Sequence, residues 1–83
     1  MKITVRYFAS IREAAGTSSE ALDTRSATLA QLRDELIQRP GTGGAALARG
    51  RAVRMALNQV MSEETVALTE GCEVAFFPPV TGG

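Results

Sequence analysis

The stretch TLAQLRDELIQRPG, residues 28–41, decides the fold because it contains the strongest helix signal in the chain. Thr28 and Gln31 have the Ser/Thr-x-x-Glu/Gln spacing of a capping box, which marks the start of a helix. The apolar positions that follow repeat at helical spacing: Leu29, Leu32, Leu36 and Ile37. Pro40-Gly41 ends the pattern, because proline cannot continue a helix. We therefore predict one long amphipathic helix whose apolar stripe packs on another element.

Segments on both sides of this helix alternate apolar and polar residues with the period of two that is typical of strands. These segments are 2–8, 19–25, 52–57 with a turn after it at Asn58-Gln59, a short one near 65–67, and 73–77. A short helix is expected at 11–15, because Ser10 and Glu13 have capping-box spacing and Gly16 follows. If the first and last strands pair, their core-facing residues meet the helix: Ile3, Val5, Val74 and Phe76. The sequence thus predicts an α+β fold, a sheet with one long helix packed on one face.

Size and composition limit the classes of protein to which the chain can belong. Its 83 residues suffice for one domain, and nine basic residues balance nine acidic ones. This balance argues against a nucleic-acid binder, which needs a surplus of cations. No apolar run approaches the ~18 residues of a membrane span, so we expect a cytoplasmic protein without membrane contact. The chain has no histidine and one cysteine, which excludes histidine-based catalysis and a Cys/His metal cluster within it.

The stretch EVAFFPPVTGG, at residues 73–83, combines bulky, stiff and very small residues in a way that a frayed terminus rarely does. Its last six residues are Pro78, Pro79, Val80, Thr81, Gly82 and Gly83. The prolines favour an extended backbone, and the two glycines have no side chains, so this end can enter a narrow channel. We therefore predict a globular domain at 1–77 and an extended tail at 78–83 whose terminal carboxylate is the working group. An accidental tail is the simpler alternative.

The aromatic residues beside this tail divide between the core and the surface. Phe76 has the parity of the core-facing positions, whereas Phe77 points to the opposite side of its strand. Phe8 has the same outward parity on the first strand, so we expect both rings to lie close together and to face solvent. Two exposed rings beside an insertion arm favour a protein interface over scattered surface residues.

Three further features have ordinary explanations. The GTGG sequence at 41–44 lacks the Lys-Ser/Thr of a phosphate loop and follows a helix, so it is predicted to be a plain loop. A basic cluster, Arg49, Arg51 and Arg54, is either a solvated face or a guide for an acidic partner surface. Cys72 has no neighbouring base or histidine to activate it, and a role as sulfur donor is the less favoured interpretation.

With these residues in hand, the chain resembles the small, sulfur-carrying subunits of molybdopterin synthase. The matching pieces are YFASIREAAG (7–16), TLAQLRDEL (28–36), ALNQ (56–59) and LTEGCEVAFFPPVTGG (68–83). They span almost the whole chain, and FFPPVTGG is the most specific of them, since Gly-Gly alone occurs in every ubiquitin-like carrier. One departure is Cys72, where the family commonly has an acidic residue in the turn.

The resemblance implies a ubiquitin-like β-grasp fold with a mixed sheet and a chain that is not itself catalytic. It implies that a ubiquitin-activating-like enzyme uses ATP to adenylate the carboxylate of Gly83, which then becomes a thiocarboxylate. It implies docking on a large catalytic subunit through Phe8 and Phe77, with the tail 78–83 inserted there. The sulfur passes to cyclic pyranopterin monophosphate, in a complex that is a heterotetramer in the family. The carrier then binds no cofactor of its own, since ATP and the pterin belong to its partners.

Three other interpretations stay open on the sequence. A β-grasp carrier for the thiazole of thiamine or for cysteine shares the Gly-Gly end, although FFPPVTGG and YFASIRE fit it less well. A ubiquitin-like modifier uses the same carboxyl chemistry but transfers its terminus to lysines. A plain interaction domain with an idle tail is the remaining alternative.

Overall fold

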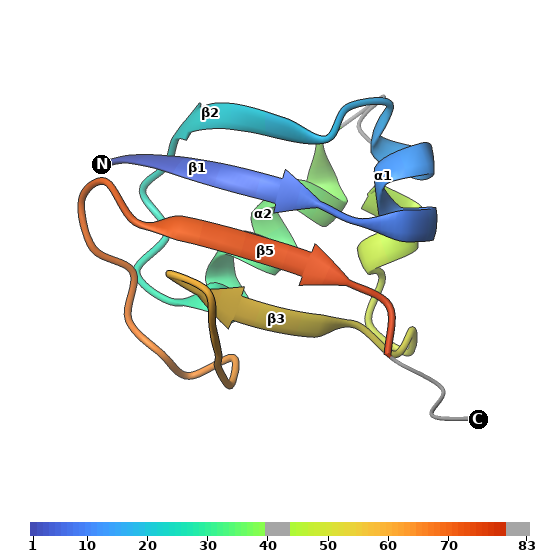
Figure 1. Cartoon of the computed structure of the whole chain (residues 1–83). Coiled ribbons are helices and arrows are strands. Elements are labelled where there is room, and N and C mark those ends of the chain that lie inside the picture. The colour runs from blue at the N-terminus through green and yellow to red at the C-terminus, as the bar shows by residue number, and fades with distance from the viewer. Residues whose placement is uncertain (40–43, 80–83) are drawn as a thin grey trace.

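The computed structural model describes residues 1–39 and 44–79. Its elements in chain order are β1 (Lys2–Tyr7), α1 (Ala9–Ala15), β2 (Ser19–Asp23), α2 (Leu29–Gln38), the 3-10 turn η1 (Gly44–Leu47), β3 (Arg54–Leu57), β4 (Val60–Met61) and β5 (Glu73–Phe77). Figure 1 shows α2 lying behind the sheet, with α1 at the end of the sheet where β5 leads into the C-terminal segment. None of the helices in these two ranges is long and apolar enough to cross a membrane.

The sheet has five strands in the order β2-β1-β5-β3-β4. β1 and β5 run parallel at its centre, with Val5 opposite Val74, while the other neighbours are antiparallel. The predicted pairing of the first and last strands and the mixed sheet are therefore confirmed. Because parallel neighbours need a crossover, the chain between β1 and β5 must pass over one face, and α2 lies on that face.

The hydrophobic core lies between α2 and the inner face of the sheet. Leu29, Leu32 and Leu36 of α2 are fully buried and share one cluster with Val5 and Phe76. The start of α2 is fixed as its sequence predicts: the Thr28 hydroxyl accepts a hydrogen bond from the Gln31 backbone N–H at 3.2 Å. The Gln31 side chain returns a bond to the N–H of the residue before Thr28, at 2.8 Å, so the cap spans one residue more than a simple box.

The start of α1 differs from the prediction. The helix begins at Ala9, with Phe8 at its N-cap and no side chain bonding there, so the capping box predicted for Ser10 and Glu13 does not form. The strand also ends at Tyr7, one residue earlier than expected. A tertiary contact explains both differences, because the Phe8 N–H donates to the Phe76 carbonyl at 3.1 Å and pins the cap to β5. Gly16 ends the helix as predicted, with φ of 78°.

The fourth strand lies at Val60–Met61 and not near 65–67, where only one isolated bridge joins Thr28 to Ala67. The predicted turn at Asn58-Gln59 forms a tight hairpin, with φ of 49° and 69° at its two residues. The second and third strands are also shorter than expected, ending at Asp23 and starting at Arg54. After the segment 40–43, the chain forms the 3-10 turn η1, whose first residue is Gly44.

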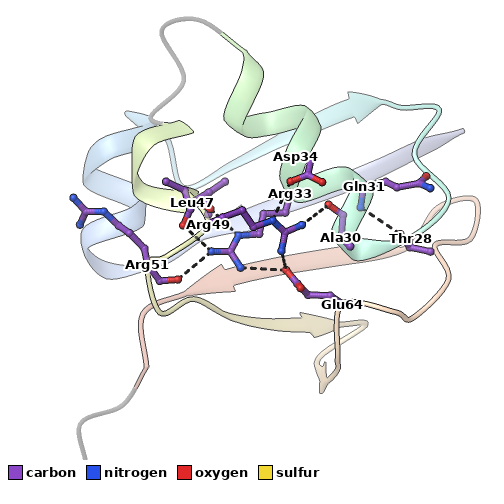
Figure 2. Close-up of polar contacts among 10 residues, drawn as sticks. Thr28, Ala30, Gln31, Arg33, Asp34, Leu47, Arg49, Arg51 and Glu64 are labelled. Carbon is purple, nitrogen blue, oxygen red and sulfur yellow. Dashed lines mark hydrogen bonds and ion pairs between the residues drawn. The ribbon is translucent and has the colours of Figure 1, made fainter.

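A buried arginine connects α2 to the segment that follows η1, as Figure 2 shows. The Arg33 guanidinium donates to the backbone carbonyls of Leu47 at 2.6 Å, Ala48 at 2.9 Å and Arg51 at 3.0 Å. Its remaining side pairs with the Glu64 carboxylate at 3.2 Å. Arg33 thus satisfies carbonyl groups that no sheet or helix ladder serves, and holds this segment against α2.

The predicted basic cluster is not one unit. Arg49 folds back onto α2, where it pairs with Asp34 at 3.0 Å, donates to the Ala30 carbonyl at 3.1 Å and also pairs with Glu64 (Figure 2). Arg51 and Arg54 are exposed, and their side chains make no ion pair within residues 1–39 and 44–79. Arg49 therefore has a structural role, which leaves two of the three cations for contact with other molecules.

Candidate functional site

A groove of about 750 Å³ runs along the outer face of the sheet, opposite α2. We call it the outer groove, and its apolar lining includes Phe8, Ala56, Met61, Ala75, Phe77 and Pro78. Alternation along β5 explains its origin, because Val74 and Phe76 point into the core while the residues between and after them point outward. This groove is an open surface whose lining is mainly apolar.

The two predicted aromatic rings lie together at one end of the outer groove. Phe8 and Phe77 are 6.3 Å apart between ring centroids and meet edge to face at 90°. Phe8 is 42% exposed, whereas Phe77 is half-buried, so only one ring faces solvent to the extent that the sequence predicted. The two rings shield each other, and together they form the wall of the groove rather than two separate protrusions.

One charged pair borders this aromatic wall. The Arg6 guanidinium lies 5.6 Å from the centroid of the Phe8 ring and 3.7 Å from the Glu73 carboxylate. The Arg6 side chain is thus held along the rim by a ring on one side and a carboxylate on the other. A groove with an apolar interior and a polar rim is the usual organisation of a protein interface.

The outer groove is hollow at its floor because residues with small side chains lie opposite each other on neighbouring strands. Ala75 of β5 lies opposite Ala56 of β3 and also opposite Arg6 of β1. Met61, which is 51% exposed, pairs with Ala56 from the edge strand and forms the wall facing the aromatic rings. Sequence reasoning missed Met61 because β4 has only two residues, although the Asn58-Gln59 turn implied a returning strand.

The backbone beside the aromatic wall is strained. Ala9 has φ of 51°, a conformation that costs a residue with a Cβ roughly 1 kcal/mol. On one side of it, the Phe8 carbonyl accepts from the N–H groups of Ile11 and Arg12, at 3.1 Å and 3.3 Å. These bonds and the Phe8 bond to β5 fix the ring where it borders the groove, and such strain is commonly found at binding sites.

The tail begins at the mouth of the outer groove. Pro78 and Pro79 are half-buried and both line it. Of the predicted tail, Val80, Thr81, Gly82 and Gly83 lie outside the described residues. The predicted roles of the tail and of its terminal carboxylate therefore stay predictions, and the structure adds that Pro78 and Pro79 lie beside the apolar outer groove.

Internal chemistry has few candidates in the rest of the described chain. Cys72 is 3% exposed and belongs to the hydrophobic core, so its thiol has no access to a reactant. Residues 1–39 and 44–79 contain no group of three or more His, Cys, Asp or Glu side chains that could hold a metal ion.

Comparison with known sequences gives consistent matches over nearly the whole chain. The sequence profile of the ThiS family matches residues 5–83. The molybdopterin synthase sulfur carrier subunit of Haemophilus influenzae is 37% identical over 81 residues, covering 98% of this chain and 99% of the relative. The molybdopterin synthase sulfur carrier subunit of Escherichia coli K12 is 38% identical over 81 residues, with coverage of 98% and 99%.

Solved structures agree with the fold. The crystal structure of SAMP1 from Haloferax volcanii is similar over 100% of both chains, with a TM-score of 0.77 and 25% identity. A chain in the complex of subunits 1 and 2 of molybdopterin-converting factor from Helicobacter pylori is similar over 100% of both chains, with a TM-score of 0.68 and 25% identity. The predicted ubiquitin-like β-grasp fold is confirmed.

Proposed function

Because the chain belongs to the ThiS family and its curated relatives are molybdopterin synthase sulfur carrier subunits, we propose that it carries sulfur for molybdenum cofactor synthesis. In this role it is the non-catalytic small subunit of molybdopterin synthase. The terminal carboxylate of Gly83 is the group that is loaded and unloaded. The sulfur is delivered to cyclic pyranopterin monophosphate in the active site of the large subunit.

The observation that carries this proposal is the position of the outer groove beside the root of the tail. Pro78 and Pro79 line the groove, and the chain continues from them to Gly82-Gly83. A partner that covers the groove therefore lies where the tail emerges. The six residues from Pro78 to Gly83 span at most ~20 Å when extended, which is enough to reach a buried active site. A partner that docks on the outer groove is thus within reach of the tail that delivers the sulfur.

The chemistry explains why a bare carboxylate needs activation. A carboxylate is a poor electrophile, because its charge repels nucleophiles and its oxygen is a poor leaving group. In the proposed reaction the Gly83 carboxylate attacks the α-phosphate of ATP, pyrophosphate leaves, and an acyl-adenylate forms. A sulfide then attacks the acyl carbon, the bond to AMP breaks, and a thiocarboxylate results. If the sulfur comes from a persulfide, the first product is an acyl disulfide, and a thiol must cleave its S–S bond by thiol–disulfide exchange to release the thiocarboxylate. A ubiquitin-activating-like enzyme supplies the ATP site for this step.

The thiocarboxylate is then a nucleophilic sulfur on a narrow, extended arm. Its sulfur attacks a side-chain carbon of the pterin, a carbon–oxygen bond at that carbon breaks, and a thioester joins the two molecules. Water then hydrolyses the bond between the Gly83 carbonyl carbon and the sulfur, which leaves the sulfur on the pterin and restores the carboxylate for another cycle. Binding of the globule raises the effective concentration of this sulfur at the pterin. Two such deliveries complete one dithiolene. The carrier itself needs no bound cofactor, because ATP and the pterin occupy its partners.

Intact-mass spectrometry tests the proposal directly. After incubation with the adenylating enzyme, ATP and a sulfur source, we expect the mass of one oxygen-to-sulfur exchange. The matched control is a chain with one residue added after Gly83, which keeps the fold but removes the glycine carboxylate. An unchanged mass of the natural chain, under conditions in which the Escherichia coli carrier reacts, would contradict the proposal.

A ubiquitin-like modifier is the second candidate, and one observation favours it. SAMP1, a small archaeal modifier protein, shares the fold over the whole length of both chains. A modifier forms an amide between its terminal glycine and a lysine of another protein. Proteolytic digestion of cell extract would then yield lysine-linked remnants of the tail, whereas a dedicated sulfur carrier yields none.

A further inference from the structure

A second groove lies on the other side of the tail root, between α1 and η1. It has a volume of about 520 Å³, and we call it the alanine groove. Its lining is dominated by small residues of α1, η1 and the segment after it: Ala14, Ala45, Ala46 and Ala52, with Ile11 at the base. Pro78 and Pro79 line this groove as well as the outer groove, so the two prolines form a ridge between them.

The position of η1, which forms one wall of the alanine groove, is fixed by its packing on α2. At the start of η1, a Cβ on Gly44 would lie 2.6 Å from the Ile37 carbonyl oxygen, so only glycine allows η1 to approach α2 so closely. Arg33 holds the following segment through the carbonyl groups of Leu47 and Arg51 (Figure 2). The groove is therefore a fixed feature of the fold and does not depend on a partner to form it.

Among the described residues, the only charged one that lines the alanine groove is a cation, Arg51. Arg51 lines it and is exposed, and none of the other lining residues is acidic. The Arg51 carbonyl is fixed by Arg33, but its guanidinium makes no ion pair with any residue in ranges 1–39 and 44–79. This contrasts with Arg49, two residues away, which has carboxylate partners within the chain. A cation beside a small apolar concavity is complementary to a carboxylate next to an aliphatic side chain.

We propose that the alanine groove is a second docking site for the large catalytic subunit, which inserts an aliphatic side chain and pairs a carboxylate with Arg51. The inference rests on the proposed function, since it assigns this groove to the partner that receives the tail. The ridge of Pro78 and Pro79 supports it, because a protein that encloses the tail root contacts both sides of the ridge. The two grooves then hold the root from opposite sides and aim the tail.

The test uses the full chain and the purified large subunit, with affinity measured by isothermal titration calorimetry. Arg51→Glu reverses the cation and Ala14→Trp fills the concavity. Their matched controls are Arg25→Glu and Ala27→Trp, which change an exposed arginine and an exposed alanine outside both grooves. We expect each groove variant to weaken binding about tenfold and each control by less than about twofold. The Arg51→Glu effect should shrink at high ionic strength.

The other outcomes overturn the inference in distinguishable ways. Undiminished binding by both groove variants, alongside lost binding by Phe77→Asp, removes the second site and leaves the proposed function intact. If Phe77→Asp also binds normally, docking through the outer groove fails as well. Normal binding to the large subunit with slower ATP–pyrophosphate exchange assigns the groove to the adenylating enzyme instead. A change confined to sedimentation of the free chain assigns it to a second copy.

Discussion

The two faces of the sheet are made from the same strands but differ in how their side chains pack. On the inner face, Val74 and Phe76 are fully buried beneath α2. On the outer face, Ala75 and Phe77 of the same strand line an open groove. The inner face has large side chains that fill space, while the outer face has alanines that leave space between the aromatic rings and Met61. The difference shows that alternation within one strand can produce one face that stabilises the fold and another that leaves an open, mainly apolar surface.

The sharpest way to break this comparison is to truncate neighbouring phenylalanines. Phe76→Ala should lower the free energy of unfolding by about 3–5 kcal/mol, because it leaves a cavity in the core. Phe77→Ala should cost only about 1 kcal/mol, since the ring is half-buried and loses mainly its contact with Phe8. Urea unfolding followed by circular dichroism measures both. Equal losses would show that the outer ring is part of the core.

A second variant tests whether the stability of the side that α2 covers depends on the buried charge of Arg33 as well as on apolar packing. Arg33→Ala removes the guanidinium bonds to the carbonyls of Leu47, Ala48 and Arg51, of which the Ala48 carbonyl keeps its bond from the Arg51 N–H. The change should cost about 2–4 kcal/mol in unfolding free energy. Arg25→Ala is the matched control and should change stability by less than ~0.5 kcal/mol, since that side chain is exposed. The same denaturant experiment measures both, and equal stability of the two variants would contradict this role of Arg33.

On the open face, the expected effect is on binding and not on folding. Phe77→Asp places a charge in the apolar wall of the outer groove, and should weaken binding to the large subunit about a hundredfold. Val60→Asp is its matched control, because Val60 is 65% exposed but does not line the groove. Calorimetric titration of both variants checks this, with melting curves to show that each stays folded. A similar loss for both would point to general surface charge as the cause.

How far the sequence predicts these features depends on whether a residue is set by local pattern or by tertiary contact. Thr28, the leucine stripe and the parity of Phe76 and Phe77 follow from spacing alone, and the structure has all of them as predicted. The start of α1 depends on a bond from Phe8 to β5, which no local pattern contains. The role of Arg49 was missed for the same reason, since Glu64 approaches it from a distant part of the chain.

The alanine groove is another feature that local sequence patterns do not predict, because several elements build it. Its alanines come from α1, η1 and the segment after η1, and each of them is unremarkable in its own stretch of sequence. Only the packing of η1 on α2, which Gly44 permits, brings them together. Arg51 likewise has the appearance of any surface arginine until its neighbours are known. Concave sites assembled from small residues of several elements therefore have little sequence signal.

The last prediction concerns Tyr7 on the inner face at high pH, where we expect the phenol not to ionise while the protein stays folded. Tyr7 is the single tyrosine of the chain, which has no tryptophan, so the phenolate absorbance reports on this residue alone. The Tyr7 hydroxyl donates to the Glu20 carboxylate at 2.8 Å. Burial raises the pKa of this phenol well above its usual range, and the Glu20 hydrogen bond and charge raise it further, while the nearby Arg39 lowers it.

Since the pKa is higher in the folded state, the stability that Tyr7 contributes is complete below about pH 10 and falls as the pH rises above that value. Absorbance at the phenolate band should therefore stay flat through pH 10 and rise only together with the loss of the circular dichroism signal. In Glu20→Gln the carboxylate charge is gone, so ionisation should begin at lower pH than in the natural chain. A phenolate step near pH 10 in a fully folded protein would show that the inner face is open to solvent at Tyr7, and the contrast between the two faces would then be weaker than the packing indicates.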